Sequence, residues 1–274
     1  MSDVFQEIVK LRKEGRKGAL ATIIQVQGSI PSYESSKILV RDDGSIVGTV
    51  GGGCVEAEVW SAAQDVMREE KPRRLHFNLN AKPEYDAGLV CGGSLDIFIE
   101  PILSTPSLYL FGAGHVSLSI SKVASLAGFE TIVSDDREAF ANSERFPEAL
   151  ETHAGPWEEI FPQLKISELS YIVIATRGHK GDLACLREAL KTPARYIGMI
   201  GSKRKIIEFS KALDAEGAAP ERLEQVHSPV GLAIGALTPE EIAVSVVAEM
   251  IAVRRNALAS VPSLTYKPKV QQTS

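Results

Sequence analysis

Cysteine is scarce in this sequence of 274 residues, which contains only Cys54, Cys91 and Cys185. An odd count without a Cys-x-x-Cys pair argues against a disulfide scaffold and against a structural zinc site. The sequence also lacks an apolar run of about 18 residues, so we expect no membrane span. Its start lacks the basic and apolar regions of a signal peptide, and we therefore expect a cytoplasmic protein.

An excess of basic residues is also absent. The 30 Lys and Arg residues face 35 Asp and Glu residues, which gives a net charge of −5 and argues against nucleic acid as a partner. The apolar fraction of 44% and the charged fraction of 24% are ordinary, which excludes fibrous and broadly disordered classes. The length allows one large domain or two smaller ones.

Hydrophobic patterning favours two domains within an α/β protein. Residues 1–100 mix short strands and helices, which predicts a small N-terminal α+β domain. Residues 101–107 are rich in proline and serine and predict a linker. In residues 108–256 apolar strands alternate with helices, as in a Rossmann-like, doubly wound parallel sheet. Residues 257–274 are polar and basic and predict a flexible tail.

The segment Gly112–Ser117 has most of a dinucleotide fingerprint between a strand and a helix. Gly112 allows the tight turn, and Gly114 lets the backbone approach a pyrophosphate at the helix N-terminus. The third fingerprint position is Ser117 instead of glycine or alanine. The alternative is a Rossmann-like fold that keeps these glycines for packing and binds no dinucleotide.

An acidic pair occupies the place expected for the residue that binds the ribose. Asp135 and Asp136 follow the next predicted strand, about 20 residues beyond the glycines. A carboxylate there favours the free 2′-hydroxyl of NAD over the 2′-phosphate of NADP. Arg137 next to the pair weakens that discrimination.

A second glycine loop lies in the N-terminal part. Gly51, Gly52 and Gly53 precede a predicted helix and leave amide groups free for an anion. Cys54 then lies at a helix N-terminus, a location that makes a thiol more reactive. Cys91 also adjoins glycines. The alternatives are a tight turn with a buried cysteine, and two unrelated small core residues.

Two further strands are followed by polar residues that a parallel sheet brings to its ligand crevice. Arg177 and His179 follow one strand, and Ser202 and Lys203 follow the next. Ser202 is a candidate helix cap, and the basic residues after it suit phosphate. The alternative for the basic run is a solvated helix face. We identify no catalytic framework, although His115 and His179 are possible acid–base groups.

Ordered motifs cover nearly the whole chain. The N-terminal ones are Gly28-Ser29-x-Pro31, Asp43-Gly44-x-x-x-Gly48-Thr49-Val50-Gly51-Gly52-Gly53-Cys54-Val55-Glu56, Asp86-x-Gly88-x-x-Cys91-Gly92-Gly93 and Phe98-x-Glu100-Pro101. The C-terminal ones are Phe111-Gly112-Ala113-Gly114-His115-Val116, Asp135-Asp136-Arg137, Glu144-Arg145-Phe146-Pro147, Thr176-Arg177-Gly178-His179, Gly198-Met199-Ile200-Gly201-Ser202 and Ser228-Pro229-x-Gly231-Leu232. Together they resemble the XdhC/CoxI family of xanthine dehydrogenase accessory factors.

This resemblance implies an accessory protein that binds molybdenum cofactor. It implies help with sulfuration of the cofactor by a cysteine desulfurase and with its insertion into a molybdenum hydroxylase such as xanthine dehydrogenase. Cys54 and Cys91 become candidate metal contacts, since thiolates are soft ligands. The glycine loops and the segment after Ser202 become candidate sites for the phosphate of the pterin or for a nucleotide, NAD(P) included. We expect a homodimer because such dimers are common.

One departure from the family pattern concerns the first loop. Many members have arginine after the proline of Gly-Ser-x-Pro, whereas here Ser32 follows Pro31. Serine does not replace the bidentate anion clamp of an arginine. Two other functions remain open at this point, an NAD-dependent oxidoreductase that uses the Rossmann domain and a scaffold that docks both enzymes without holding cofactor.

Overall fold

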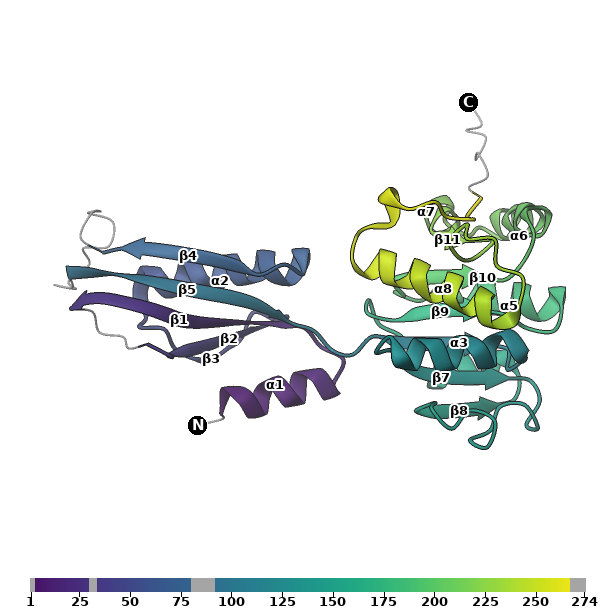
Figure 1. Ribbon diagram of the computed structural model, residues 1–274, viewed down its shortest axis with the longest axis horizontal. Coiled ribbons are helices and arrows are strands. Elements are labelled where there is room, and N and C mark those ends of the chain that lie inside the picture. The colour runs from purple at the N-terminus through teal and green to yellow at the C-terminus, as the bar shows by residue number, and fades with distance from the viewer. Residues whose placement is uncertain (1–2, 30–33, 80–91, 267–274) are drawn as a thin grey trace, which may run out of the picture. The chain divides into compact units, whose positions relative to one another are not determined.

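The computed structural model describes residues 3–29, 34–79 and 92–266. The chain separates into two compact units, Met1–Ser104 and Thr105–Ser274 (Figure 1). Among the described residues, none of the helices combines the length and apolar character that a membrane crossing needs.

The first unit is built around an antiparallel sheet. Its strands lie in the order β3-β2-β1-β5-β4, and neighbouring strands run antiparallel. The elements are α1 (Val4–Lys13), β1 (Gly18–Ser29), β2 (Lys37–Arg41), β3 (Ile46–Gly48), α2 (Gly53–Glu69), β4 (Arg73–Asn78) and β5 (Gly92–Ile102). This arrangement confirms the predicted small N-terminal domain with both helices and strands.

Helix α2 covers one face of this sheet because its apolar residues repeat at helical spacing. Val59, Ala63 and Val66 are buried against residues such as Ile23 and Ile97 on the central strands. Strand β5 continues further than its sequence suggests, since Pro101 still pairs with Ala19 of β1. A proline is tolerated at the end of a strand, where few ladder hydrogen bonds remain.

The second unit is a six-stranded parallel sheet in the order β8-β7-β6-β9-β10-β11. Numbered within the unit, this is the 3-2-1-4-5-6 order of dinucleotide-binding Rossmann folds. The strands are β6 (Ser107–Phe111), β7 (Glu130–Asp135), β8 (Glu151–Ala154), β9 (Tyr171–Ile174), β10 (Tyr196–Met199) and β11 (Val226–His227). The predicted doubly wound parallel sheet is confirmed.

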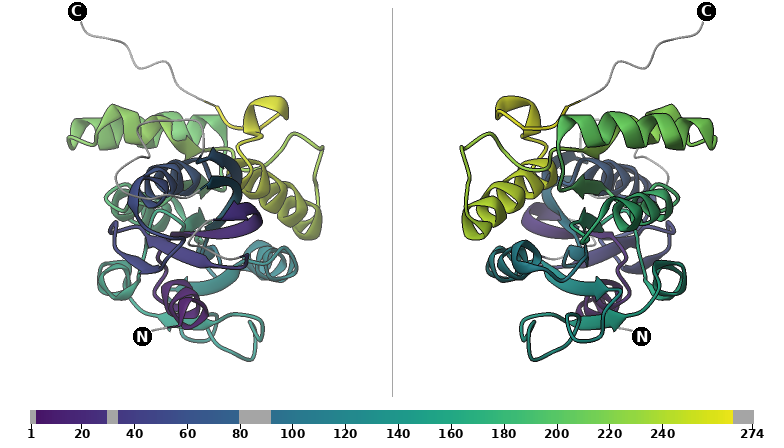
Figure 2. Two further views of the ribbon diagram at one scale, coloured as in Figure 1. Left: turned by 90° about the vertical axis from the view of Figure 1, so that its left-hand side faces the viewer. Right: turned by 90° about the vertical axis from the view of Figure 1, so that its right-hand side faces the viewer.

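Helices cover both faces of this sheet because alternate strand residues point to opposite sides. Leu108 and Leu110 face the layer of α3 and α8, whereas Tyr109 and Phe111 face the layer of α4, α5 and α6. Figure 2 shows α3 and α8 on one side of the sheet and α5 on the other. The helices are α3 (His115–Leu126), α4 (Trp157–Ile160), α5 (His179–Ala189), α6 (Lys203–Ala215), α7 (Pro220–Glu224) and α8 (Pro239–Arg254), with short 3-10 turns η2 (Phe161–Gln163) and η3 (Leu258–Ser260).

Part of the segment that the sequence predicts to be a flexible tail belongs to the second unit. The amide of Leu264 donates to the carbonyl of Gly231, and the amide of Tyr266 donates to the carbonyl of Ser228, both at 2.9 Å. Ser263 and Thr265 also contact the buried carboxylate of Glu249 in α8. These polar residues are held because they satisfy a buried charge.

Candidate functional site

The candidate site lies at the carboxyl ends of the parallel strands of the second unit. The strand order reverses between β6 and β9, which is the place where open α/β sheets form a ligand crevice. Strand β6 leads into the predicted fingerprint Gly112–Ser117, β9 into residues 175–178 and β10 into residues 200–202. Residues from all these segments line one pocket of about 500 Å³.

Gly112 makes the turn that the fingerprint requires. Its φ of +101° lies in the left-handed region that favours glycine. A Cβ atom there would lie 2.2 Å from the carbonyl oxygen of Ala175 at the end of β9. The turn therefore packs against the neighbouring strand, and a side chain at position 112 does not fit.

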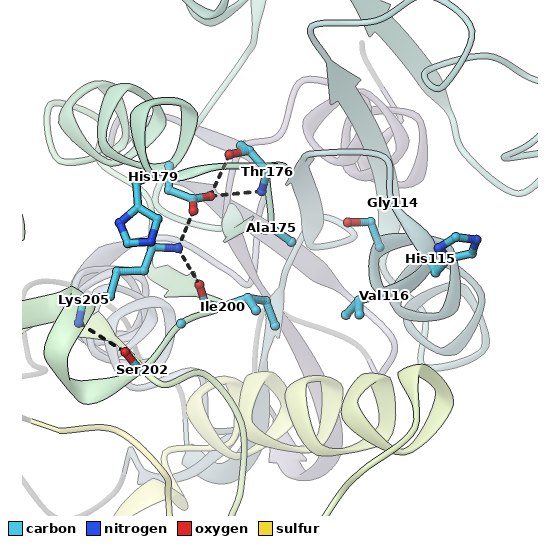
Figure 3. Close-up of a pocket in the computed structure, with 12 residues that line it drawn as sticks. Gly114, His115, Val116, Ala175, Thr176, His179, Ile200, Ser202 and Lys205 are labelled. Carbon is cyan, nitrogen blue, oxygen red and sulfur yellow. Dashed lines mark hydrogen bonds and ion pairs between the residues drawn. The ribbon is translucent and has the colours of Figure 1, made fainter.

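The first turns of α3, α5 and α6 contribute to the pocket (Figure 3). Gly114 and Gly178 cap α3 and α5 without a side-chain hydrogen bond, whereas the Ser202 hydroxyl caps α6 by accepting from the Lys205 amide at 3.3 Å. The predicted helix-capping role of Ser202 is confirmed. Helix N-termini carry amide groups without intrahelical partners and a partial positive charge, so this pocket favours an anion.

A buried ion pair supports the wall of the pocket. The ammonium of Lys205 contacts the Asp182 carboxylate and donates to the carbonyl of Ile200 at 3.0 Å. The other oxygen of Asp182 accepts from the amide of Thr176 at 3.0 Å and from its hydroxyl at 2.8 Å. The pair ties α5, α6 and the loop after β9 together (Figure 3).

The two histidines of the pocket are both exposed. His179 begins α5, and its ring lies edge-on to Phe209 with centroids 6.0 Å apart. Figure 3 shows the His115 ring pointing away from Thr176 and Lys205. The imidazole rings of His115 and His179 therefore do not face each other across the pocket.

Asp135 is buried and held by its neighbours. Its carboxylate accepts from the amide of Ala113 at 2.7 Å and from Arg137, through Nε at 2.7 Å and Nη2 at 3.0 Å. Burial opposes its ionisation, but the hydrogen bonds from Arg137 and Ala113 prevail and hold the pKa of Asp135 below its usual value. The sequence predicted that this carboxylate binds a ribose. In the structure it holds the glycine turn in place through the Ala113 amide.

Asp136 is more exposed than Asp135, and its carboxylate faces Arg177 and Arg137. Its carboxylate accepts from Nη2 of Arg177 at 2.9 Å and lies 3.5 Å from Nε of Arg137. Neither Asp136 nor Arg177 is among the residues that line the pocket, and Lys203 is not among them either. Lys203 places its ammonium 5.8 Å from the ring centroid of Tyr266 instead.

The glycine loop of the first unit forms a separate feature. Gly51, Gly52 and Gly53 all have positive φ, and α2 begins directly after Gly52. Cys54 lies in the first turn with an exposed thiol, which excludes the alternative of a buried cysteine. The Glu56 carboxylate accepts from the Thr49 hydroxyl at 2.8 Å and fixes the loop to the helix.

Of the two predicted metal contacts, Cys54 and Cys91, the structure describes only Cys54. Cys91 and the Pro31–Ser32 segment lie outside the described residues. Within the parts of the chain that the structure describes, no three His, Cys, Asp or Glu residues are grouped as a metal site needs. Cys185 is buried in the core of the second unit, and burial raises the pKa of its thiol.

Thr176 belongs to one of the family motifs but had no predicted role, and no sequence pattern singled out Asp182. Their pairing depends on α5 starting at His179, which places Asp182 in its first turn beside the end of β9. Lys205 was one of three basic residues after Ser202. The signal that distinguishes it is the Ser202 cap, since the third residue of a capped helix lies next to the cap.

Comparisons with known proteins agree with this architecture. The model of the XdhC Rossmann domain matches residues 108–250, and the model of the XdhC and CoxI family matches residues 11–78. A crystal structure described as a xanthine dehydrogenase from Bacillus halodurans has a TM-score of 0.51 and 23% sequence identity. It aligns over 100% of this chain and 98% of that one.

Three curated relatives align along most of the chain. The uncharacterised protein YqeB of Escherichia coli is 37% identical over 93% of this chain, which spans 47% of YqeB. A probable xanthine dehydrogenase subunit of Bacillus subtilis is 24% identical over 89% of this chain and 96% of its own length. The molybdenum cofactor insertion chaperone PaoD of E. coli is 23% identical over 92% and 88%. Because these two models together match residues 11–78 and 108–250, which is most of the chain, the chain belongs to the XdhC and CoxI family.

Proposed function

We propose that this chain binds molybdenum cofactor and assists its sulfuration and its insertion into a molybdenum hydroxylase of the xanthine dehydrogenase type. The observation that carries the proposal is the exposed Cys54 thiol on the triple-glycine loop of the first unit. The naming of PaoD as a molybdenum cofactor insertion chaperone supports the same role.

The residues around Cys54 fit such a cofactor. A Cβ atom added at Gly52 or Gly53 would meet nothing within 4 Å, so the space beside the loop is open to a ligand. A thiolate is a soft ligand that suits a sulfur-rich metal centre, which is the chemistry the cofactor supplies when bound. Cys54, together with Cys91, would contact the metal end, and the amide groups of Gly52 and Gly53 would suit an anionic group. The Gly51 amide instead donates to the Thr49 hydroxyl at 3.1 Å.

The partners follow from this role. A cysteine desulfurase would supply the sulfur, and the hydroxylase would receive the cofactor from this chain acting as a homodimer in the cytoplasm. Affinity capture of the tagged chain from extracts with and without cofactor biosynthesis tests the contacts. Capture of both enzymes only when cofactor is present supports a carrier, whereas capture in its absence favours a scaffold.

Delivery is tested with hydroxylase that lacks its cofactor. The chain is purified from cells that make the cofactor, mixed with the apo-hydroxylase, and the recovered activity is measured. We expect activation by the wild type and a loss of at least tenfold with Cys54→Ala. Cys185→Ala is the matched control because that thiol is buried in the core of the second unit, and it should deliver normally.

A second candidate function is that of an NAD-dependent oxidoreductase. The observation that favours it is the strand order of the second unit together with the Gly112 turn. Titration with NADH followed by a substrate screen distinguishes the two. Turnover would support an enzyme, and binding without turnover would leave NAD(H) as a regulator of the carrier.

A further inference from the structure

The pocket of the second unit is unusual in having several helix N-termini directed at one space. Helices α3, α5 and α6 have 12, 11 and 13 residues, so each has a full macrodipole. Gly114 and Gly178 offer no side chain to occupy the first amide groups of α3 and α5. An anion in this space therefore meets unbonded N–H groups from more than one helix.

A buried hydroxyl gives independent evidence for a ligand. Ser117 lines the pocket and is 1% exposed, and its hydroxyl has no hydrogen-bond partner among the described residues. Leaving such a group unsatisfied costs free energy, so buried hydroxyls are nearly always paired. A ligand atom that accepts from Ser117 would remove this cost.

The Lys205 ammonium in the pocket is able to donate one more hydrogen bond. An ammonium group has three N–H donors, and Lys205 uses two of them on Asp182 and Ile200. Asp182 is fully engaged by Lys205 and Thr176, so its charge is compensated. The remaining donor of Lys205 is available to an anionic oxygen.

The groups that a dinucleotide would need lie elsewhere and are engaged with one another. Asp135 accepts from Ala113 and Arg137, and Asp136 pairs with Arg177. None of these side chains lines the pocket, which is formed by the loops after β6, β9 and β10. The space therefore lies on the side of the crevice opposite β7, away from the position of the ribose acid.

We propose that this pocket binds the terminal phosphate of a phosphate monoester, with the Ser117 hydroxyl, the first amides of α3 and α5 and the Lys205 ammonium as donors. The proposal differs from a pyrophosphate site of the usual dinucleotide kind. The proposed site holds a single phosphate group. The proposal does not depend on whether the chain binds molybdenum cofactor.

The test compares the wild type with Ser117→Ala by isothermal titration calorimetry, using inorganic phosphate, AMP and NAD⁺ as probes. Alanine is an ordinary third residue of the dinucleotide fingerprint, so a dinucleotide site would keep its affinity in this variant. We expect phosphate and AMP to compete for one site in the wild type, NAD⁺ to bind no more tightly than AMP, and Ser117→Ala to weaken both phosphate and AMP by about tenfold or more.

The matched control is Ser121→Ala, one turn along the same helix. The Ser121 hydroxyl is also buried but is bonded to Thr131 at 3.2 Å, so this variant should lose stability and keep its phosphate affinity. Ser117→Ala should not lower the melting temperature, because it removes an unpaired buried group. Absence of phosphate binding at millimolar concentration, unchanged binding in Ser117→Ala, or NAD⁺ binding at least tenfold tighter than AMP would each overturn the proposal.

Discussion

The guanidinium of Arg177 lies 2.9 Å from the carboxylate of Asp136, although their strands, β9 and β7, are separated by β6. The ion pair thus joins loops on either side of the strand that leads into the Gly112 turn. Asp135, the preceding residue, has the opposite environment, since it is buried beneath the turn and bonded to Ala113. Two adjacent acids therefore have different roles, one in bracing the loop and one at the surface of the crevice.

This difference predicts unequal effects of the same substitution. Asp135→Asn places an amide donor against Ala113 and Arg137, so we expect it to lower the free energy of unfolding by about 3 kcal/mol. Asp136→Asn removes only solvent-accessible ion pairs, with Arg177 at 2.9 Å and with Arg137 at 3.5 Å, and we expect less than about 1 kcal/mol. Urea denaturation at pH 7 measures both, and equal losses would contradict the assignment.

The buried carboxylate of Glu249 should make the stability of the protein depend on pH. Burial alone would raise its pKa, but hydrogen bonds from groups that include His227, Ser263 and Tyr196 lower the pKa to about 2. The unfolded carboxyl titrates near 4.3, so the stabilisation is complete above that pH and is lost as the pH falls towards 2. The difference corresponds to about 3 kcal/mol.

Glu249→Gln is the variant that isolates this contribution. Denaturation curves between pH 6 and pH 3 should show a smaller loss of stability in the variant than in the wild type, and a lower stability at pH 6 because a glutamine amide faces several donors. Parallel pH profiles for the two proteins would show that the acid loss arises elsewhere in the chain.

The two glycines of the fingerprint predict opposite outcomes for alanine. Gly112→Ala forces a side chain into the Ala175 carbonyl at positive φ, and we expect it to cost about 3 kcal/mol or to prevent folding. A Cβ atom at Gly114 meets nothing within 4 Å, so Gly114→Ala should fold normally. Because Gly114 lines the pocket, this variant should bind phosphate more weakly, as calorimetry would measure.

The cysteines predict a simple labelling pattern. In a Cys91→Ser background, an aromatic disulfide reagent should react quickly with the exposed Cys54 and with Cys185 only after denaturation, because Cys185 is buried and its thiol has a raised pKa. Absorbance of the released thiolate counts the groups. Rapid reaction of both thiols in the native protein would contradict the assigned burial.

Features set by neighbouring residues were predictable from the sequence, and those set by packing were not. The Gly112 turn and the Ser202 cap each depend on residues close in the chain, and the structure contains them. The Lys205–Asp182 pair joins two helices. No local pattern encodes such a pairing, since it depends on how α5 and α6 pack on the sheet.

The orientation of Asp135 illustrates the same limit. Its position after β7 is that of a ribose-binding acid, and spacing alone does not reveal which way the carboxylate points. Arg137, two residues later, donates to both carboxylate oxygens, and the Ala113 amide also donates to the carboxylate. That choice is decided by burial and hydrogen bonding within the folded unit.

The most direct test of the proposed function is the molybdenum and pterin content of the purified chain. The protein is produced in cells that make the cofactor, metal is measured by mass spectrometry, and the pterin is measured by fluorescence after oxidation. We expect the wild type and Cys185→Ala to retain both in equal amounts and Cys54→Ala to lose them while staying folded. A wild-type chain that carries neither molybdenum nor pterin would contradict the proposed function.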